Sequence, residues 1–233
     1  MESLNFKIIA RIKSDFPEKF GIPRQSGLVK GLRSVVYFEP EFRNADALRG
    51  LEGFSHLWLL WIFSENVRES WNPTVRPPRL GGNTRLGVFA TRSSFRPNPI
   101  AMSCVKIEEI RLDRPEGPDI VVSGADLMDG TPIVDIKPYL PYADSIPDAK
   151  GGFAVTVGGN NLEVAIPDAF FTKIPPEKRE ALREVLAQDP RPHYHDDPER
   201  TYGFAFAGME IKFQVKDGTL TVTGIESCAP HIH

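Results

Sequence analysis

Apolar residues in this chain come in short runs separated by turn residues, a pattern typical of β-rich proteins. The run from Leu57 to Phe63 is apolar on both faces, and at seven residues it suits a fully buried strand better than a helix. The run over 101–112 is long enough to bend around a barrel. In all, the pattern predicts strands at 6–12, 34–38, 57–63, 86–91, 101–112, 120–123 and 133–137, and a short helix at 44–50 capped by Asn44. Residues 1–148 are therefore expected to form a mostly β barrel or sandwich.

The pattern changes near Pro147, Asp148 and the Gly151–Gly152 pair, which mark a predicted domain boundary. Beyond it, hairpins are predicted at 153–166 and at 209–225, the second closing on Lys216-Asp217-Gly218. A helix is predicted at 176–188, where one face is apolar: Ala181, Leu182, Val185 and Leu186. The sequence thus divides into a β domain at 1–148 and a smaller α+β domain at 149–233.

The charge of the chain is unevenly distributed. Its net charge is -3 and its pI about 6.0, which argues against a wholly basic nucleic-acid-binding surface. From Ser70 to Ile107, however, there is no acidic residue, and the basic ones are Arg76, Arg79, Arg85, Arg92, Arg96 and Lys106. This segment is either a partner-binding surface or a set of solvated loop arginines.

Several common chemistries lack support in the sequence. There is no Walker A motif, HExxH, GxSxG or early GxGxxG, and the two cysteines, Cys104 and Cys228, show no CxxC spacing. The His193/His195 and His231/His233 pairs have no third ligand at a recognisable spacing, so no metal is expected. The first residues lack the apolar core of a signal peptide and no run is long enough to span a membrane, which predicts a cytoplasmic protein.

Three segments contain polar and charged residues that core packing does not explain. They are Pro23-Arg24-Gln25, the stretch from Arg79 to Pro99, and the stretch from Asp126 to Tyr139. The planar guanidinium group of arginine can donate two parallel hydrogen bonds to a phosphate or a carboxylate, and aspartates accept hydrogen bonds from a ribose diol or an amine. Rigid Pro and Gly loops let backbone groups reach a ligand. These three segments favour a binding site for a nucleotide-like ligand with an anionic end. The alternative interpretation is that they form salt bridges at the rim of a barrel and bind no ligand.

The strings PRQSGLVK, ADALRGLEGFSHLW, RPPRLGGNTRLGVFATRSSFRPNPI and DGTPIVDIKPYLP resemble those of the TrmO (TsaA-like) family, and LREVLAQDPRP resembles its C-terminal signature. The resemblance implies a small β-barrel that binds S-adenosylmethionine as a homodimer. It also implies methylation of N6 in the threonylcarbamoylated adenosine (t6A) 3′ of the anticodon of threonine tRNA.

By the same resemblance, cofactor contacts are expected from Pro23, Arg24, Gln25, Ser64, Glu65, Arg92, Met102, Asp126, Leu127, Met128 and Asp129. For Arg92 the alternative partner is a tRNA phosphate. Asp135 or Asp129 is expected to accept or orient the N6 proton, with Lys137 and Tyr139 positioning the substrate. The alternative for Asp135 is a structural role toward backbone amides. Phosphate contacts to tRNA are expected from Arg76, Arg79, Arg85 and Arg96.

Two other functions fit the same residues. One is a module that senses S-adenosylmethionine and binds a protein partner without methylating anything. The other is methylation of a different RNA or of a small metabolite, since loops build the acceptor pocket.

Overall fold

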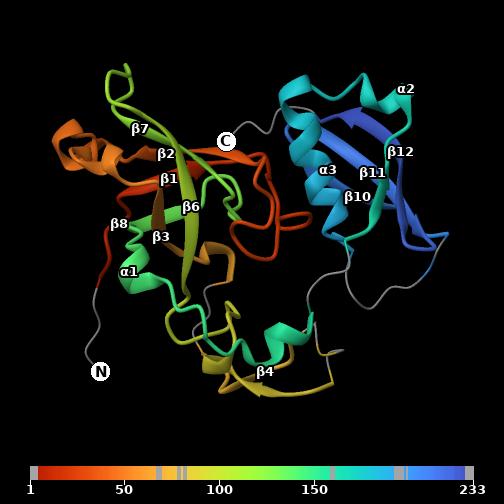
Figure 1. Ribbon diagram of the computed structural model, residues 1–233, viewed down its shortest axis with the longest axis horizontal. Helices are drawn as coiled ribbons and strands as arrows, with labels where there is room; N and C mark the ends of the chain where they lie inside the picture. The colour runs from red at the N-terminus through yellow and green to blue at the C-terminus, as the bar shows by residue number, and fades with distance from the viewer. Residues whose placement is uncertain are drawn as a thin grey trace. The chain divides into compact units, whose positions relative to one another are not determined.

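The computed structural model describes residues 5–66, 70–77, 80, 83–157, 161–191, 197 and 199–228. The contacts of the chain divide it into two compact units that interleave along the sequence (Figure 1). The first unit contains Met1–Lys13, Ser34–Ser123 and Gly130–Ile146, and the second contains Ser14–Arg33, Gly124–Asp129 and Pro147–His233. The division at residue 148 stays a prediction, and two segments N-terminal to it belong to the second unit by their contacts.

The first unit is built on a closed barrel with the strand order β1-β2-β7-β6-β3-β8. Its strands are β1 (Ala10–Lys13), β2 (Arg33–Phe38), β3 (His56–Ile62), β6 (Ile100–Arg111), β7 (Asp119–Ser123) and β8 (Pro132–Pro138). Closure leaves no exposed sheet edge. The mainly β class predicted from the apolar pattern is thereby confirmed, as a barrel rather than a sandwich.

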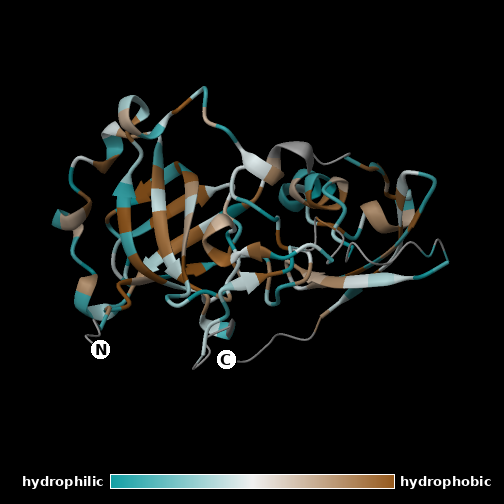
Figure 2. Cartoon of the chain, turned by 90° about the horizontal axis from the view of Figure 1, so that it is seen from below, coloured by the Kyte–Doolittle hydropathy of each residue, from teal (hydrophilic) through white to brown (hydrophobic). Residues whose placement is uncertain are grey.

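Side chains alternate between the inside and the outside of the barrel, and Figure 2 shows apolar and polar positions alternating along its strands. In β3, Leu57, Leu59 and Trp61 are buried, whereas Trp58 and Leu60 are only half-buried. The expectation that β3 is buried on both faces is wrong, because a barrel strand turns just one face to the interior. Inside, the indole nitrogen of Trp61 donates to Ser103 Oγ at 3.0 Å.

The long strand β6 changes partner along its length, as its predicted bend requires. It pairs with β3 from Ile100 to Lys106 and with β7 from Lys106 to Arg111, with a register shift between Ile107 and Glu109. Such a bulge increases the local twist and bends the strand.

Short elements complete the first unit. Asn44 caps a 3₁₀-helix, with its side chain accepting from Asp46 N at 2.9 Å, where a short helix was predicted. The strand predicted at 86–91 ends early, because a 3₁₀-helix takes over after Gly87. These elements are η1 (Pro40–Phe42), η2 (Ala45–Leu48), η3 (Leu51–Gly53), η4 (Ser64–Asn66), β4 (Thr74–Val75), β5 (Leu86–Gly87), η6 (Val88–Ala90) and α1 (Pro141–Asp144).

The second unit contains a four-stranded sheet with the order β10-β11-β12-β9. The predicted helix is confirmed as η8 followed by α3, and the predicted hairpin as β11 and β12. The hairpin predicted at 153–166 is wrong, because β9 pairs in parallel with β12 and a 3₁₀-helix precedes it. The elements are η7 (Gly152–Val157), β9 (Glu163–Ala165), α2 (Asp168–Phe171), η8 (Pro176–Lys178), α3 (Arg179–Ala187), β10 (Tyr202–Phe206), β11 (Met209–Lys216) and β12 (Thr219–Ser227).

The core of the second unit includes residues from the early segment 14–33. Phe16, Val29 and Leu32 are buried in one cluster with Leu182 of α3 and Phe204 of β10. Burying a large apolar side chain is worth about 1.5–3 kcal/mol, so the early segment is tied to this unit by its apolar residues. No helix among the described residues is long and apolar enough to cross a membrane.

Candidate functional site

Two rows of residues cross the outer face of the barrel over β8, β3 and β6. Strand pairing places Asp135, Leu60 and Met102 in one row and Lys137, Trp58 and Cys104 in the next. Neighbouring strands lie about 4.8 Å apart, so the backbone of Asp135 is roughly 10 Å from that of Met102. The barrel thus brings three sequence-predicted residues, Asp135, Lys137 and Met102, to one face.

Asp135 and Lys137 form an ion pair on this face, with Lys137 Nζ 2.8 Å from Asp135 Oδ2. The other carboxylate oxygen, Oδ1, accepts from the backbone N–H of Ile136 at 2.9 Å. The Asp135 side chain remains 44% exposed. A carboxylate in this setting is oriented by its neighbours and can still be reached by a substrate.

Tyr139 packs beside this pair in an aromatic cluster. Its ring centroid is 5.9 Å from that of Trp58 and 6.2 Å from that of His56. The Trp58 indole donates to Asp144 Oδ2 at 3.0 Å. The backbone N–H of Leu140 and the Trp58 indole N–H both lower the pKa of Asp144, since they stabilise its charged form. Tyr139 is therefore held by ring packing at the end of β8.

Cys104, in the row of Lys137 and Trp58, is half-buried. Burial raises the pKa of its thiol, and the negative charge of Asp144 adds to the effect. The neutral thiol is therefore the favoured form, which argues against a nucleophilic cysteine on this face.

Asp129 has a structural role in the second unit. Its Oδ1 accepts from the backbone N–H of Ser14 at 2.8 Å, and its own N–H donates to Phe16 O at 2.7 Å. Ser14 Oγ donates to Leu127 O at 2.9 Å. The two proposed catalytic carboxylates thus belong to different compact units, and Asp129 already binds a backbone amide.

The structure brings together two of the predicted cofactor segments, 23–25 and 126–129. Gly27 N donates to Gly124 O at 2.8 Å, and Gly124 N donates to Leu32 O at 3.0 Å. Asp126 and Met128 are half-buried, whereas the Leu127 side chain is in the core and only 1% exposed. Leu127 therefore offers backbone groups alone to a ligand.

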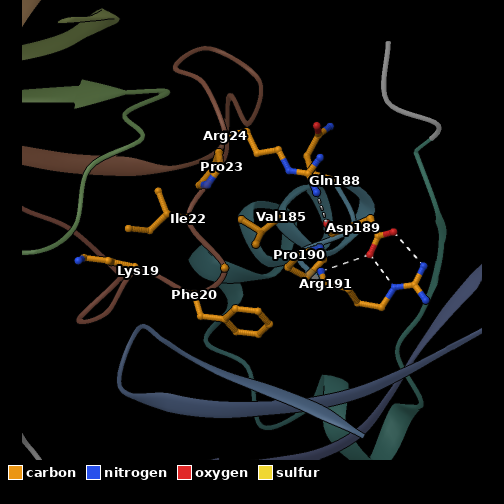
Figure 3. A pocket seen from close by; sticks show the side chains of 11 residues that line it. Lys19, Phe20, Ile22, Pro23, Arg24, Val185, Gln188, Asp189, Pro190 and Arg191 are labelled. Atoms are coloured by element: carbon orange, nitrogen blue, oxygen red, sulfur yellow. Dashed lines mark hydrogen bonds and ion pairs between the residues drawn. The ribbon is translucent and has the colours of Figure 1, made fainter. Parts of the chain in front are cut away.

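Residues 19–24, which include Pro23 and Arg24 of the predicted cofactor loop, form one wall of a pocket of about 180 Å³ (Figure 3). Pro23 is buried, and Arg24 Nη2 donates to Asp189 O at 3.2 Å. Gln25 Nε2 donates to the carbonyl of Arg24 at 2.6 Å. The opposite wall comes from the end of α3 and the turn after it: Val185, Gln188, Asp189, Pro190 and Arg191.

The turn after α3 was not among the predicted site residues. Asp189 has a positive φ of 50° and receives two hydrogen bonds from Arg191, at 2.8 and 2.9 Å. Burial raises the pKa of Asp189, but the hydrogen bonds and charge of Arg191 outweigh burial and hold it below its usual range. The string Asp189-Pro190-Arg191 was visible in the sequence, yet its contact with Arg24 was not.

The remaining predicted contacts lie in the first unit. Ser64 and Glu65 are exposed in η4, directly after β3, and Met102 is 49% exposed on β6. Arg76, Arg85 and Arg92 are exposed, whereas Arg96 is half-buried and its Nη1 donates to Thr91 O at 3.1 Å. Arg79 and all the paired histidines lie outside the described residues. Within the described part of the chain, no cluster of three or more His, Cys, Asp or Glu side chains is arranged to hold a metal ion.

A closed barrel thus carries an acid, a lysine and a tyrosine on its outer face, and the second unit carries loops with arginine and aspartate. The family model of the tRNA-methyltransferase O N-terminal domain matches residues 11–145, and that of the TrmO C-terminal domain matches residues 161–228. The chain belongs to the TrmO family.

Individual relatives cover nearly the whole chain. A protein of Escherichia coli named tRNA (adenine(37)-N6)-methyltransferase is 44% identical over 97% of this chain and 99% of its own. A Pseudomonas aeruginosa protein named putative S-adenosylmethionine-dependent methyltransferase RcsF is 40% identical over 87% of this chain and 89% of its own. The crystal structure of TrmO from P. aeruginosa superposes with a TM-score of 0.78 at 33% identity, covering 97% of this chain and 98% of that one.

Proposed function

We propose that this protein transfers a methyl group from S-adenosylmethionine to N6 of adenosine 37 in tRNA, and that the natural acceptor is the t6A of threonine tRNA. The observation that carries the proposal is the match of both units to relatives named for this reaction at adenosine 37. The oriented, exposed carboxylate of Asp135 on the barrel supports it.

The residues of the second unit fit an S-adenosylmethionine site. Two loops are joined by the backbone hydrogen bond from Gly27 N to Gly124 O, and they carry Arg24, Gln25 and Asp126. Cationic, amide and carboxylate groups are the partners that a carboxylate, an adenine edge and a ribose diol require. When bound, this cofactor supplies a methyl group already activated on a positively charged sulfur. The protein's main contribution is to align the acceptor and exclude water, which is worth up to about 7–11 kcal/mol.

Asp135 is the better of the two proposed proton acceptors. In t6A, N6 belongs to a urea-like group whose proton is more acidic than that of an adenine amine, so a carboxylate suits its removal. Asp135 is exposed and paired with Lys137, whereas Asp129 Oδ1 binds Ser14 N and holds a loop. In this mechanism Asp135 accepts the N6 proton, and Lys137 and Tyr139 position the modified base.

Contacts to the tRNA backbone fall to the exposed arginines of the segment 70–107, Arg76, Arg85 and Arg92, and to Arg96. Their guanidinium groups match phosphate geometry. Arg79 belongs to the same proposal from its sequence position alone. Homodimer formation stays a prediction from the resemblance, and a cytoplasmic location stays a prediction from the sequence.

The test is mass spectrometry of tRNA nucleosides from a strain that lacks this protein. We expect the N6-methylated form of t6A to disappear from threonine tRNA and to return on complementation, with t6A itself unaffected. In vitro, purified protein should methylate tRNA that carries t6A and leave unmodified tRNA untouched. Methylation of neither would contradict the proposal and favour a module that only senses S-adenosylmethionine, and transfer to another RNA would change the substrate.

A further inference from the structure

The first unit exposes a pair of stacked aromatic rings that neither the barrel core nor the proposed chemistry uses. The rings of Trp71 and Phe89 have centroids 5.9 Å apart and planes inclined by 28°. Trp71 is 49% exposed and Phe89 72% exposed. Exposing two large rings side by side forgoes the stability that burial gives, so the pair points to a binding role.

Backbone hydrogen bonds hold the two rings together. The strands β4 and β5 pair Thr74 with Gly87 and Val75 with Leu86. Just beyond this ladder, Val88 N donates to Pro73 O at 2.9 Å. The ring-bearing segments on either side of the ladder are therefore pre-positioned.

A small pocket of about 100 Å³ adjoins Trp71, with Phe95 and Arg96 in its wall. The Arg96 guanidinium is fixed because its Nη1 donates to Thr91 O at 3.1 Å and to Ser93 O at 3.5 Å. A guanidinium carries five N–H donors, so anchoring through Nη1 leaves Nε and Nη2 to serve a ligand. The pocket combines an apolar ring wall with a fixed cation. Its lining residues are Ser70, Trp71, Asn72, Ser94, Phe95, Arg96 and Pro99.

We propose that Trp71, Phe89 and this pocket bind one unstacked base of the RNA substrate. Sequence-specific recognition of RNA loops relies on bases stacked on aromatic rings or guanidinium planes. The segment from Ser70 to Ile107 has no acidic residue, so the surroundings of the rings are complementary to a polyanion. This assignment rests on the proposed function, because it names the RNA that the same site receives.

The experiment compares ring-preserving with ring-removing substitutions. Trp71→Leu and Phe89→Leu keep apolar bulk but lose the π-face, whereas Trp71→Phe and Phe89→Tyr retain it. Binding of a synthetic anticodon stem-loop RNA that contains t6A is measured by fluorescence anisotropy over a range of salt concentrations. The matched control is Phe6→Leu, which alters another exposed aromatic ring, 59% exposed and outside the segment.

We expect each leucine variant to bind the stem-loop roughly 5- to 150-fold more weakly, the range that corresponds to the loss of one base–aromatic stack. The ring-preserving variants and Phe6→Leu should stay within about twofold of wild type. Since stacking releases no counterions, the dependence of log K on log salt should keep its slope in the leucine variants. Affinity for S-adenosylmethionine and thermal unfolding should be unchanged, which separates loss of stacking from misfolding.

Wild-type protein that methylates the stem-loop while the leucine variants bind it normally would overturn this inference and leave the proposed function intact. A wild type that binds the stem-loop without methylating it would contradict the proposed function instead. If the leucine variants altered the oligomeric state measured by light scattering and bound RNA normally, the rings would belong to a contact between copies of the chain. That outcome would also overturn the inference.

Discussion

Asp135 and Asp129 are six positions apart in sequence, and their surroundings give them different roles. The Asp129 carboxylate accepts a hydrogen bond from the backbone N–H of Ser14 and so connects Ser14 to its own segment. The Asp135 side chain lies on the outer face of the barrel, where the backbone N–H of Ile136 and the Lys137 ammonium group orient it. Sequence alone left these roles open, because it does not state which amide each carboxylate reaches.

Asp135→Asn should therefore reduce the rate of methyl transfer by at least about 100-fold, the lower end of what a positioned proton acceptor contributes. The measurement is single-turnover transfer at saturating S-adenosylmethionine. The matched variant Asp129→Asn keeps an oxygen that can accept from Ser14 N, so it should retain most of this rate with little change in the free energy of unfolding. Near-normal transfer by a folded Asp135→Asn protein would show that the base assignment is incorrect.

Two glycines of the early segment differ in the space around them. Gly21 has a φ of 89°, and a Cβ placed there would overlap the ring of Phe204. Gly27 has a φ of 78°, and a Cβ there would meet nothing within 4 Å. Both positions carry the left-handed backbone penalty of roughly 1–2 kcal/mol, and only Gly21 adds the cost of overpacking, about 1–3 kcal/mol.

Gly21→Ala is accordingly expected to lower the free energy of unfolding by about 2–5 kcal/mol, and Gly27→Ala by about 1–2 kcal/mol. Urea unfolding of both variants and the wild type measures the difference. Equal losses would mean that the Phe204 ring can move aside at no cost.

At the scale of elements, helix α3 supports the loop that the resemblance assigns to the cofactor. Glu184 Oε2 accepts from Gly31 N at 3.0 Å near one end of this loop, and the turn after α3 accepts from Arg24 near the other. Gly31 also lies against the helix, since a Cβ there would be 3.3 Å from the Ala181 backbone. The helix is thus a candidate for setting the shape of a ligand loop.

We predict that Glu184→Ala weakens S-adenosylmethionine binding by roughly tenfold, because an unsatisfied Gly31 N–H costs about 1–3 kcal/mol and loosens the loop. Isothermal titration calorimetry gives the affinity. Arg183→Ala, at the neighbouring exposed position of α3, is the control and should bind normally. Undiminished binding by Glu184→Ala would assign the helix a purely structural role.

Elements defined by local pattern were predictable from the sequence. The apolar face of α3 follows helical spacing, and the β11–β12 hairpin closes on Asp217 and Gly218, both of which have the positive φ that such a turn needs. The hairpin expected at 153–166 failed because β9 finds its partner in β12, more than fifty positions away. Long-range pairing of this kind has no local signature.

The parts of the candidate site that lie in segments of unusual composition were predictable from the sequence. The segments 23–25 and 126–129 were both selected for their chemistry, and the structure joins them through Gly27 and Gly124. The support from Glu184 and Asp189 was not foreseen, because an acidic residue on a helix is by itself an ordinary solvated side chain. Trp71 and Phe89 were not foreseen either, because their proximity depends on the pairing of the short strands β4 and β5.

At the scale of the whole molecule, net charge is a poor guide to binding. The chain carries -3 overall, yet one segment without acidic residues carries three exposed arginines, Arg76, Arg85 and Arg92. Affinity for tRNA should fall as salt rises, and Arg85→Gln or Arg92→Gln should each reduce the slope of log K against log salt by about 1. The control is Arg49→Gln, an exposed arginine outside the segment and paired with Asp46. A slope that neither variant changes would remove these arginines from the RNA-binding surface.

The interleaving of the two units has a consequence for how the protein forms during translation. Phe16, Val29 and Leu32 leave the ribosome early, but the strands and helix that bury them lie between 163 and 225. At roughly 5–20 residues per second, these apolar side chains wait for about 10–40 seconds before their partners exist. The barrel can close in that interval, whereas the second unit must fold late and with high contact order. A nascent chain halted at residue 148 would therefore carry an unburied early segment and a strong tendency to bind chaperones.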